Sequence, residues 1–73
     1  MITVTLEHNT PPAKIAQVEE FLREQQLRNA DFNGVEFAVE LGEYTQLDNQ
    51  SPGVGEEDAC TLYYSIQNIL AGH

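Results

Sequence analysis

The chain has 73 residues, 41% of them hydrophobic, and its twelve acidic and three basic side chains give a formal net charge of −9. This length and composition predict one small folded domain over residues 1–73, with a core too small to enclose a deep substrate pocket. No apolar run approaches the roughly 18 residues of a membrane span, and the first residues lack the basic start of a signal peptide. Because Cys60 is the only cysteine, a cytoplasmic location is expected.

The charge is unevenly distributed along the chain. All three basic residues, Lys14, Arg23 and Arg28, precede residue 29, and residues 29–73 carry eight acidic side chains and no Lys or Arg. Such a field repels nucleic acid and anionic membranes, and it attracts a basic surface on another protein. Direct binding to nucleic acid or to a membrane is therefore not predicted.

A strand and a helix are predicted at the start of the chain. Ile2, Val4 and Leu6 alternate with polar residues, which predicts a strand with one apolar face. Residues 8–12 end this strand with polar residues and two prolines. From about residue 12 to residue 28 the apolar side chains recur at spacings of three and four, which predicts an amphipathic helix.

Residues 35–41 alternate strictly and predict a second strand. Its apolar side chains would face the core, and Glu36 and Glu40 would lie in water on the other face, about 13 Å apart. Residues 42–43 would then reverse the chain into a short third strand over residues 44–47, so that the second and third strands form a hairpin. The alternative is one long strand with a bulge at Gly42.

The C-terminal part is predicted to be a mobile loop, over residues 48–55, followed by a helix. Acidic residues at positions 56–58 favour the helix N-terminus, and Gly72 supplies a stop. The apolar stripe of this helix consists of Ala59, Leu62, Tyr63, Ile66, Ile69 and Leu70.

These elements predict an α+β fold class. We expect a small β-α-β-(β)-α domain in which two amphipathic helices pack on one face of a two- or three-stranded sheet. The strand order stays open at this stage, because the first two strands can be parallel neighbours or can flank the third.

The residue types that usually carry catalysis or bind metals are isolated in this sequence. His8 and His73 lie in a turn and at the terminus, and no Cys and His residues have the spacing of a zinc site. Cys60 is expected to be half-buried and inert on the flank of the last helix. Residues 48–58 fail the calcium-loop register, because Ala59 falls where an acidic ligand is needed. No catalytic residue, metal site or cofactor is predicted, and the chain is not expected to be an enzyme.

The acidic residues therefore remain as the functional signal. We interpret the chain as a non-catalytic inhibitor whose carboxylates stand in for phosphates and occupy the basic nucleic-acid-binding surface of a partner protein. In size, acidity and absence of catalytic residues it resembles, as a class, the small phage-encoded inhibitors of host defence that mimic DNA, such as anti-CRISPR and anti-restriction proteins. The resemblance covers composition and involves no motif, and it implies a location in the host cytoplasm. The candidate contact residues are Glu36, Glu40, Glu43, Asp48, Glu56, Glu57, Asp58 and Tyr64.

The alternative interpretation is a small homo-oligomeric interaction or assembly module that binds through an apolar surface. A homodimer would suit a small core, which gains stability from association. The uncovered sheet face, or Tyr64 if it is exposed, would supply the contact.

Overall fold

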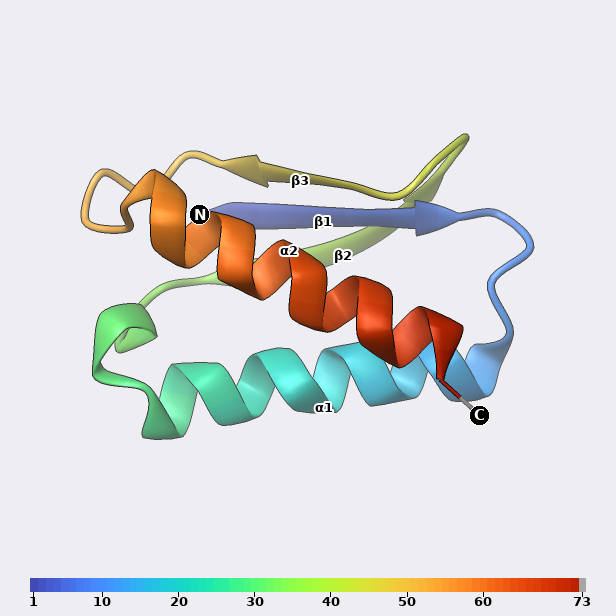
Figure 1. The fold of residues 1–73 in the computed structure, drawn as a ribbon, viewed down its shortest axis with the longest axis horizontal. Helices are drawn as coiled ribbons and strands as arrows, with labels where there is room; N and C mark the ends of the chain where they lie inside the picture. Colours follow the sequence, from blue (N-terminus) through green and yellow to red (C-terminus); the bar gives the residue numbers. More distant parts are fainter. Residues whose placement is uncertain (73) are drawn as a thin grey trace.

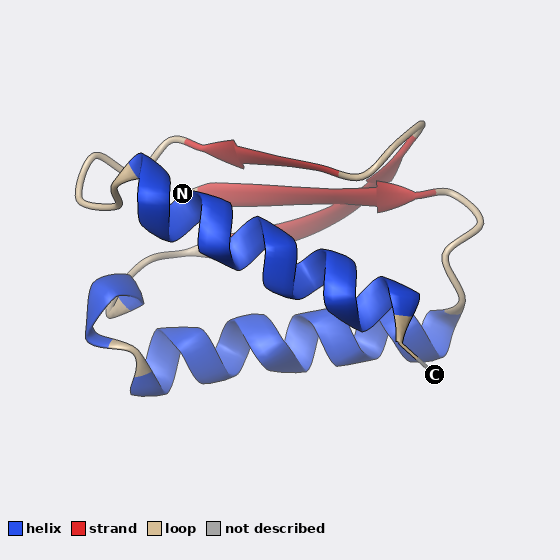
Figure 2. Ribbon diagram, viewed as in Figure 1, coloured by secondary structure: helices blue, strands red, loops and turns tan. Residues whose placement is uncertain are grey.

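A computed structural model describes residues 1–72 of the chain. The elements are β1 (Ile2–Glu7), α1 (Pro12–Arg28), the short 3-10 helix η1 (Ala30–Phe32), β2 (Phe37–Gly42), β3 (Gln46–Asn49) and α2 (Glu56–Ala71). The strands form one mixed sheet, and α1 and α2 pack on the same face of it (Figure 1). Figure 2 shows the two layers, strands on one side and helices on the other. The order β-α-β-β-α confirms the predicted α+β fold class.

β1 is the central strand of the sheet, which has the order β2-β1-β3. It pairs in parallel with β2, where Val4 lies opposite Val39, and antiparallel with β3, where Val4 lies opposite Leu47. The helix-facing side chains of Ile2, Val4 and Leu6 are at most 1% exposed, because neighbouring strands shield them on both edges and the helices cover them. β2 and β3 are therefore both edge strands.

The predicted hairpin between the second and third strands is wrong. The chain does reverse after β2, but residues 43–45 pass over the C-terminal end of β1, and β3 then pairs with β1. Crossing two strand spacings covers about 10 Å, which takes about three extended residues. This crossing moves the third strand from the predicted residues 44–47 to Gln46–Asn49. Alternation marks the apolar face of a strand, but it does not specify the neighbour of that strand.

The core lies between the sheet and the helices. Each helix contributes two fully buried side chains from its predicted apolar stripe. Phe32 of η1 and Val54 of the loop before α2 are also buried, although sequence analysis assigned neither to the core. The buried hydrophobic residues are Ile2, Val4, Leu6, Val18, Leu22, Phe32, Val54, Leu62 and Ile66.

The loop before α2 begins at Gln50, two residues later than predicted, and it is held to the sheet. The Asn49 side chain donates a 3.0 Å hydrogen bond to the Val54 carbonyl oxygen and accepts another from the Ser51 amide, also at 3.0 Å. The Met1 amine donates to the Ser51 hydroxyl at 2.9 Å. Asn49 thus closes the loop as an Asx turn, and the buried Val54 attaches it to the core.

Lys14 joins the two helices at one end of the molecule. Its amine donates to the carbonyl oxygens of Ile69, at 2.9 Å, and Gly72, at 2.6 Å, where α2 ends. The last carbonyls of a helix lack intrahelical partners and carry partial negative charge, so a cation there is favourable. The first turn of α1 therefore supplies the cap of α2.

Candidate functional site

The sheet face opposite the helices carries three of the predicted contact residues. We call it the outer sheet face. On one side of β1, Glu40 lies opposite Thr5, and on the other side Asp48 lies opposite Thr3. Glu36 immediately precedes β2, and its carbonyl oxygen accepts a hydrogen bond from the Ile2 amide at 2.9 Å. By register and alternation the outer sheet face includes Thr3, Thr5, Glu36, Ala38, Glu40, Gln46 and Asp48, and the pair of Glu7 and Gly42 continues it at the C-terminal end of β1.

The carboxylates of this face lie in two rows on either side of β1. Glu36 and Glu40 are four residues apart along one edge, which is about 13 Å of extended chain. Asp48 lies on the other edge, two strand spacings or about 10 Å away in the direction across the sheet. All three side chains are exposed, and Asp48 accepts a 3.0 Å hydrogen bond from the Gln50 side chain. The Lys and Arg residues of the chain all belong to α1, in the other layer.

The floor between the two rows is made of small side chains. Thr5 is only 8% exposed although it points away from the helices. Gly42 lies against it, and a Cβ atom at Gly42 would be 2.6 Å from the Thr5 methyl carbon. Thr3 and Ala38 are half-buried. The outer sheet face is therefore shallow, with its carboxylates along both sides.

The other predicted contact residues lie elsewhere in the fold. Glu43 is exposed in the connection that crosses the end of β1. The acidic residues 56–58 form the first turn of α2, in the helix layer and beside the N-terminus of β1 (Figure 1). Tyr64, which is 63% exposed, is also on α2. The eight candidates are thus divided between two layers and do not form one surface.

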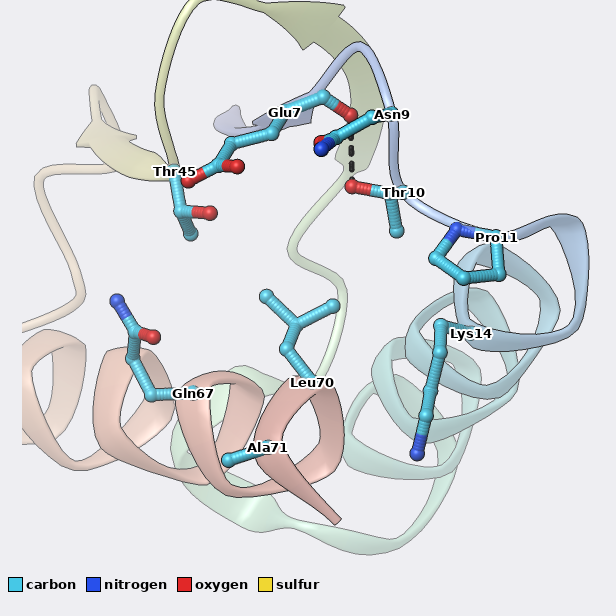
Figure 3. A pocket seen from close by; sticks show the side chains of 9 residues that line it. All are labelled: Glu7, Asn9, Thr10, Pro11, Lys14, Thr45, Gln67, Leu70 and Ala71. Atoms are coloured by element: carbon cyan, nitrogen blue, oxygen red, sulfur yellow. Dashed lines mark hydrogen bonds between the residues drawn. The ribbon is translucent and has the colours of Figure 1, made fainter. Parts of the chain in front are cut away.

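A cavity of about 370 Å³ lies at the C-terminal end of β1. Figure 3 shows Glu7 and Thr45 on one side of it and Gln67 on the other. The Thr10 hydroxyl donates to the Glu7 carbonyl oxygen at 2.6 Å, and the Lys14 amine is bonded to the end of α2. Two of the three N–H donors of that amine are bound to these carbonyl oxygens, and Lys14 is the one Lys or Arg among the residues that line the cavity.

Cys60 and His8 are both exposed. The expectation that Cys60 is half-buried is wrong, because the sheet ends at β3 and no further strand covers that flank of α2. His8 lies in the turn after β1, and His73 lies outside the described residues. No group of three His, Cys, Asp or Glu in residues 1–72 is placed to hold a metal ion.

A second concave surface, which sequence analysis missed, runs along β3. We call it the β3 groove. It has a volume of about 530 Å³, and it lies between β3 and α2. Residues that line it include Leu47 and Asn49 of β3 and Glu56, Ala59, Cys60 and Tyr63 of α2. The groove exists because β3 is an edge strand, and the local sequence pattern does not encode that position.

No family model matches this chain, and comparisons with curated proteins and with solved structures find no match either. Among the described residues, neither helix is long and apolar enough to cross a membrane.

Proposed function

We propose that this chain is a non-catalytic acidic inhibitor that binds the basic nucleic-acid-binding surface of a partner protein. The observation that carries the proposal is the outer sheet face, on which Glu36, Glu40 and Asp48 flank a floor of small side chains. All Lys and Arg residues of the chain lie on α1, so no Lys or Arg side chain neutralises this face. Carboxylates placed in this way present negative charge to a partner as the phosphates of a nucleic acid do.

The charge density of the molecule supports this reading. Its longest dimension of 31 Å, divided by nine net negative charges, gives about 3.4 Å of length per charge. Duplex DNA carries one charge per about 1.7 Å of axis, and each of its strands one per about 3.4 Å. Averaged over the whole molecule, the protein therefore has about the linear charge density of one strand and half that of a duplex. A basic channel that contacts mainly one strand is the better-matched target.

The placement of these acids on a sheet favours binding. Sheet residues have a defined backbone, so less conformational freedom is lost on association than from a disordered acidic tail. Exposed charges act over about 8 Å at physiological ionic strength, which speeds the encounter with a basic surface. Basic side chains of the partner would also relieve the repulsion between the acids of the free protein.

Composition extends the proposal to a class of partner. The chain resembles, as a class, small phage-encoded inhibitors that mimic DNA, such as anti-CRISPR proteins. The corresponding partners are DNA-binding subunits or nucleases of a defence system in the host cytoplasm. Such proteins bind nucleic acid through channels rich in Lys and Arg, which are the surfaces that an acidic face of this kind complements.

The test compares two variants that undergo the same change of charge. The outer-face variant carries Glu36→Gln, Glu40→Gln and Asp48→Asn. The control variant carries three Glu→Gln changes at exposed positions of α1, namely Glu19, Glu20 and Glu24. Each immobilised protein captures partners from a nuclease-treated host lysate, and the partners are eluted in a salt series and identified by mass spectrometry.

The wild type and the control are expected to retain a nucleic-acid-binding protein that rising salt elutes and added DNA displaces. The outer-face variant is expected to lose it. For the purified pair, affinity should fall between about 50 and 200 mM salt, with a log–log slope shallower by about three in the outer-face variant, roughly one per carboxylate. The proposal would be contradicted if the outer-face and control variants lost the captured protein to the same extent, or if the affinity did not change with salt.

A second candidate function is a homo-oligomeric assembly module, which the open edges of the sheet favour. β2 and β3 both lack a neighbour on one side, and Leu41 at the end of β2 is 47% exposed. Edge strands of two copies can pair into one continuous sheet. Sedimentation at several protein concentrations separates the two candidates, because a species that stays monomeric throughout excludes a homodimer.

A further inference from the structure

The β3 groove combines an apolar floor with an open strand edge. Leu47, Ala59 and Tyr63 line it and are half-buried. The Tyr63 hydroxyl accepts a hydrogen bond from the Gln67 side chain at 2.6 Å, which holds the ring against α2. The groove of about 530 Å³ is larger than the cavity of about 370 Å³ at the C-terminal end of β1, and Thr45 lines both.

The backbone of β3 directs hydrogen-bonding groups toward this groove. The Gln50 amide donates to the Met1 carbonyl oxygen at 3.0 Å, which makes these two residues a hydrogen-bonded pair of the antiparallel ladder. Such pairs alternate along a ladder, so Gln46 and Asp48 bond to β1. The N–H and C=O groups of Leu47 and Asn49 therefore point away from β1, to the open edge.

The charges around the groove are acidic. Glu56 lines it at the start of α2, and Asp48 lies on the outer side of the same edge strand. The groove at the opposite edge, beside β2, is smaller, at about 210 Å³, and is lined by Arg23 together with Glu19. The β3 edge is therefore the one that favours a positively charged occupant. At this edge a second copy of the chain is a poorer occupant than a basic segment, because Glu56 lines the groove and each copy carries a net charge of −9.

We infer that the β3 groove binds an extended segment of a partner protein in which apolar and basic residues alternate. The segment would pair with β3 as a fourth strand and make main-chain hydrogen bonds to Leu47 and Asn49. Successive side chains of a strand point to opposite faces. The apolar ones would fill the groove over Ala59 and Tyr63, and the basic ones would lie on the side of Asp48. This surface is separate from the floor of the outer sheet face, and the inference extends beyond the function proposed above.

The test uses an eight-residue peptide in which lysine and valine alternate, with both ends blocked. Amide resonances of ¹⁵N-labelled protein should shift over residues 46–50, and the amides of Leu47 and Asn49 should gain protection from hydrogen exchange. The thiol of Cys60 is exposed in the groove, so its alkylation by iodoacetamide reports occupancy directly. At a free peptide concentration ten times its Kd, alkylation should slow about tenfold, by mass action.

Two control peptides separate strand addition from attraction between charges. In the first, alternate backbone nitrogens are methylated, which removes donors along one edge of the peptide and keeps all its charges. In the second, glutamate replaces lysine. Both should fail to protect Cys60. Equal protection by the methylated peptide, or resonance shifts confined to Glu36 and Glu40, would overturn the inference in favour of nonspecific electrostatic binding. The absence of any binding by the lysine peptide would overturn it as well.

Two protein variants locate the site. Cys60→Lys places a cation in the groove, and Thr61→Lys makes the same change of charge at the next exposed position of α2, which does not line the groove. Measured by titration calorimetry, the first should weaken binding of the lysine peptide much more than the second. A double variant of the outer sheet face, Glu36→Gln with Glu40→Gln, keeps Asp48 and all residues that line the groove, and it should still bind the peptide there. The experiments therefore distinguish the case in which the groove does not bind the peptide from the case in which the outer sheet face does not bind a partner.

Discussion

Replacing Gly42 by Ala is expected to destabilise the fold by pushing the end of β2 away from β1. The new Cβ atom would lie 2.6 Å from the Thr5 methyl carbon, whereas carbon atoms in contact are about 3.5–4.0 Å apart. Thr5 is β-branched and resists rotation, and Glu40 and Gln46 lie opposite it on both sides. Gly34 is the one glycine with positive φ in residues 1–72, so backbone strain at Gly42 is not the obstacle. Overpacking of this kind costs about 1–3 kcal/mol.

A second substitution isolates the contact between the two residues. Thr5→Ser removes the methyl group, keeps the hydroxyl and should cost about 0.8 kcal/mol by itself, the value of one buried methyl group. In combination with Gly42→Ala, Thr5→Ser should recover most of the stability that Gly42→Ala removes. The two changes should therefore show a favourable coupling energy of about 1–3 kcal/mol in a double-mutant cycle.

The assay is thermal and urea unfolding followed by circular dichroism. In a domain of this size 1 kcal/mol corresponds to about 4–8 °C in Tm, so the effect of Gly42→Ala lies well within measurement. If Gly42→Ala keeps the stability of the wild type, the close approach of Gly42 and Thr5 is not a constraint. If the loss of stability in the double variant equals the sum of the losses in the two single variants, the Thr5 methyl group is not the cause of the destabilisation by Gly42→Ala.

Three further measurements test the packing and the charge. Lys14→Met removes the cation that caps α2. It should lower the free energy of unfolding by about 1–2 kcal/mol, because a partly exposed charged donor of hydrogen bonds is lost. An unchanged urea midpoint would contradict this role. Val54→Ala, at a site 6% exposed, should cost about 2 kcal/mol and speed hydrogen exchange in residues 50–55. Added NaCl should raise Tm by screening repulsion between acids, and should do so less in the outer-face variant.

The local elements of the fold can be read from the amino-acid sequence alone. α1 occupies the predicted span, Pro12–Arg28, and α2 ends at Ala71, next to the predicted stop at Gly72. The alternation of Ile2, Val4 and Leu6 identified the buried face of β1. These predictions succeed because the periodicity of a helix or strand is a property of neighbouring residues, and it states which face is apolar.

Tertiary structure alone decided which segments meet. β1 is central because residues 43–45 carry the chain over its end, and this arrangement makes β3 an edge, opens the β3 groove and exposes Cys60. It also separates the acids of the outer sheet face from those of α2. The bond from Lys14 to Ile69 joins residues 55 positions apart. Such contacts depend on packing between distant parts of the chain. Hydrophobic periodicity does not predict them, because it specifies only which face of each element is apolar.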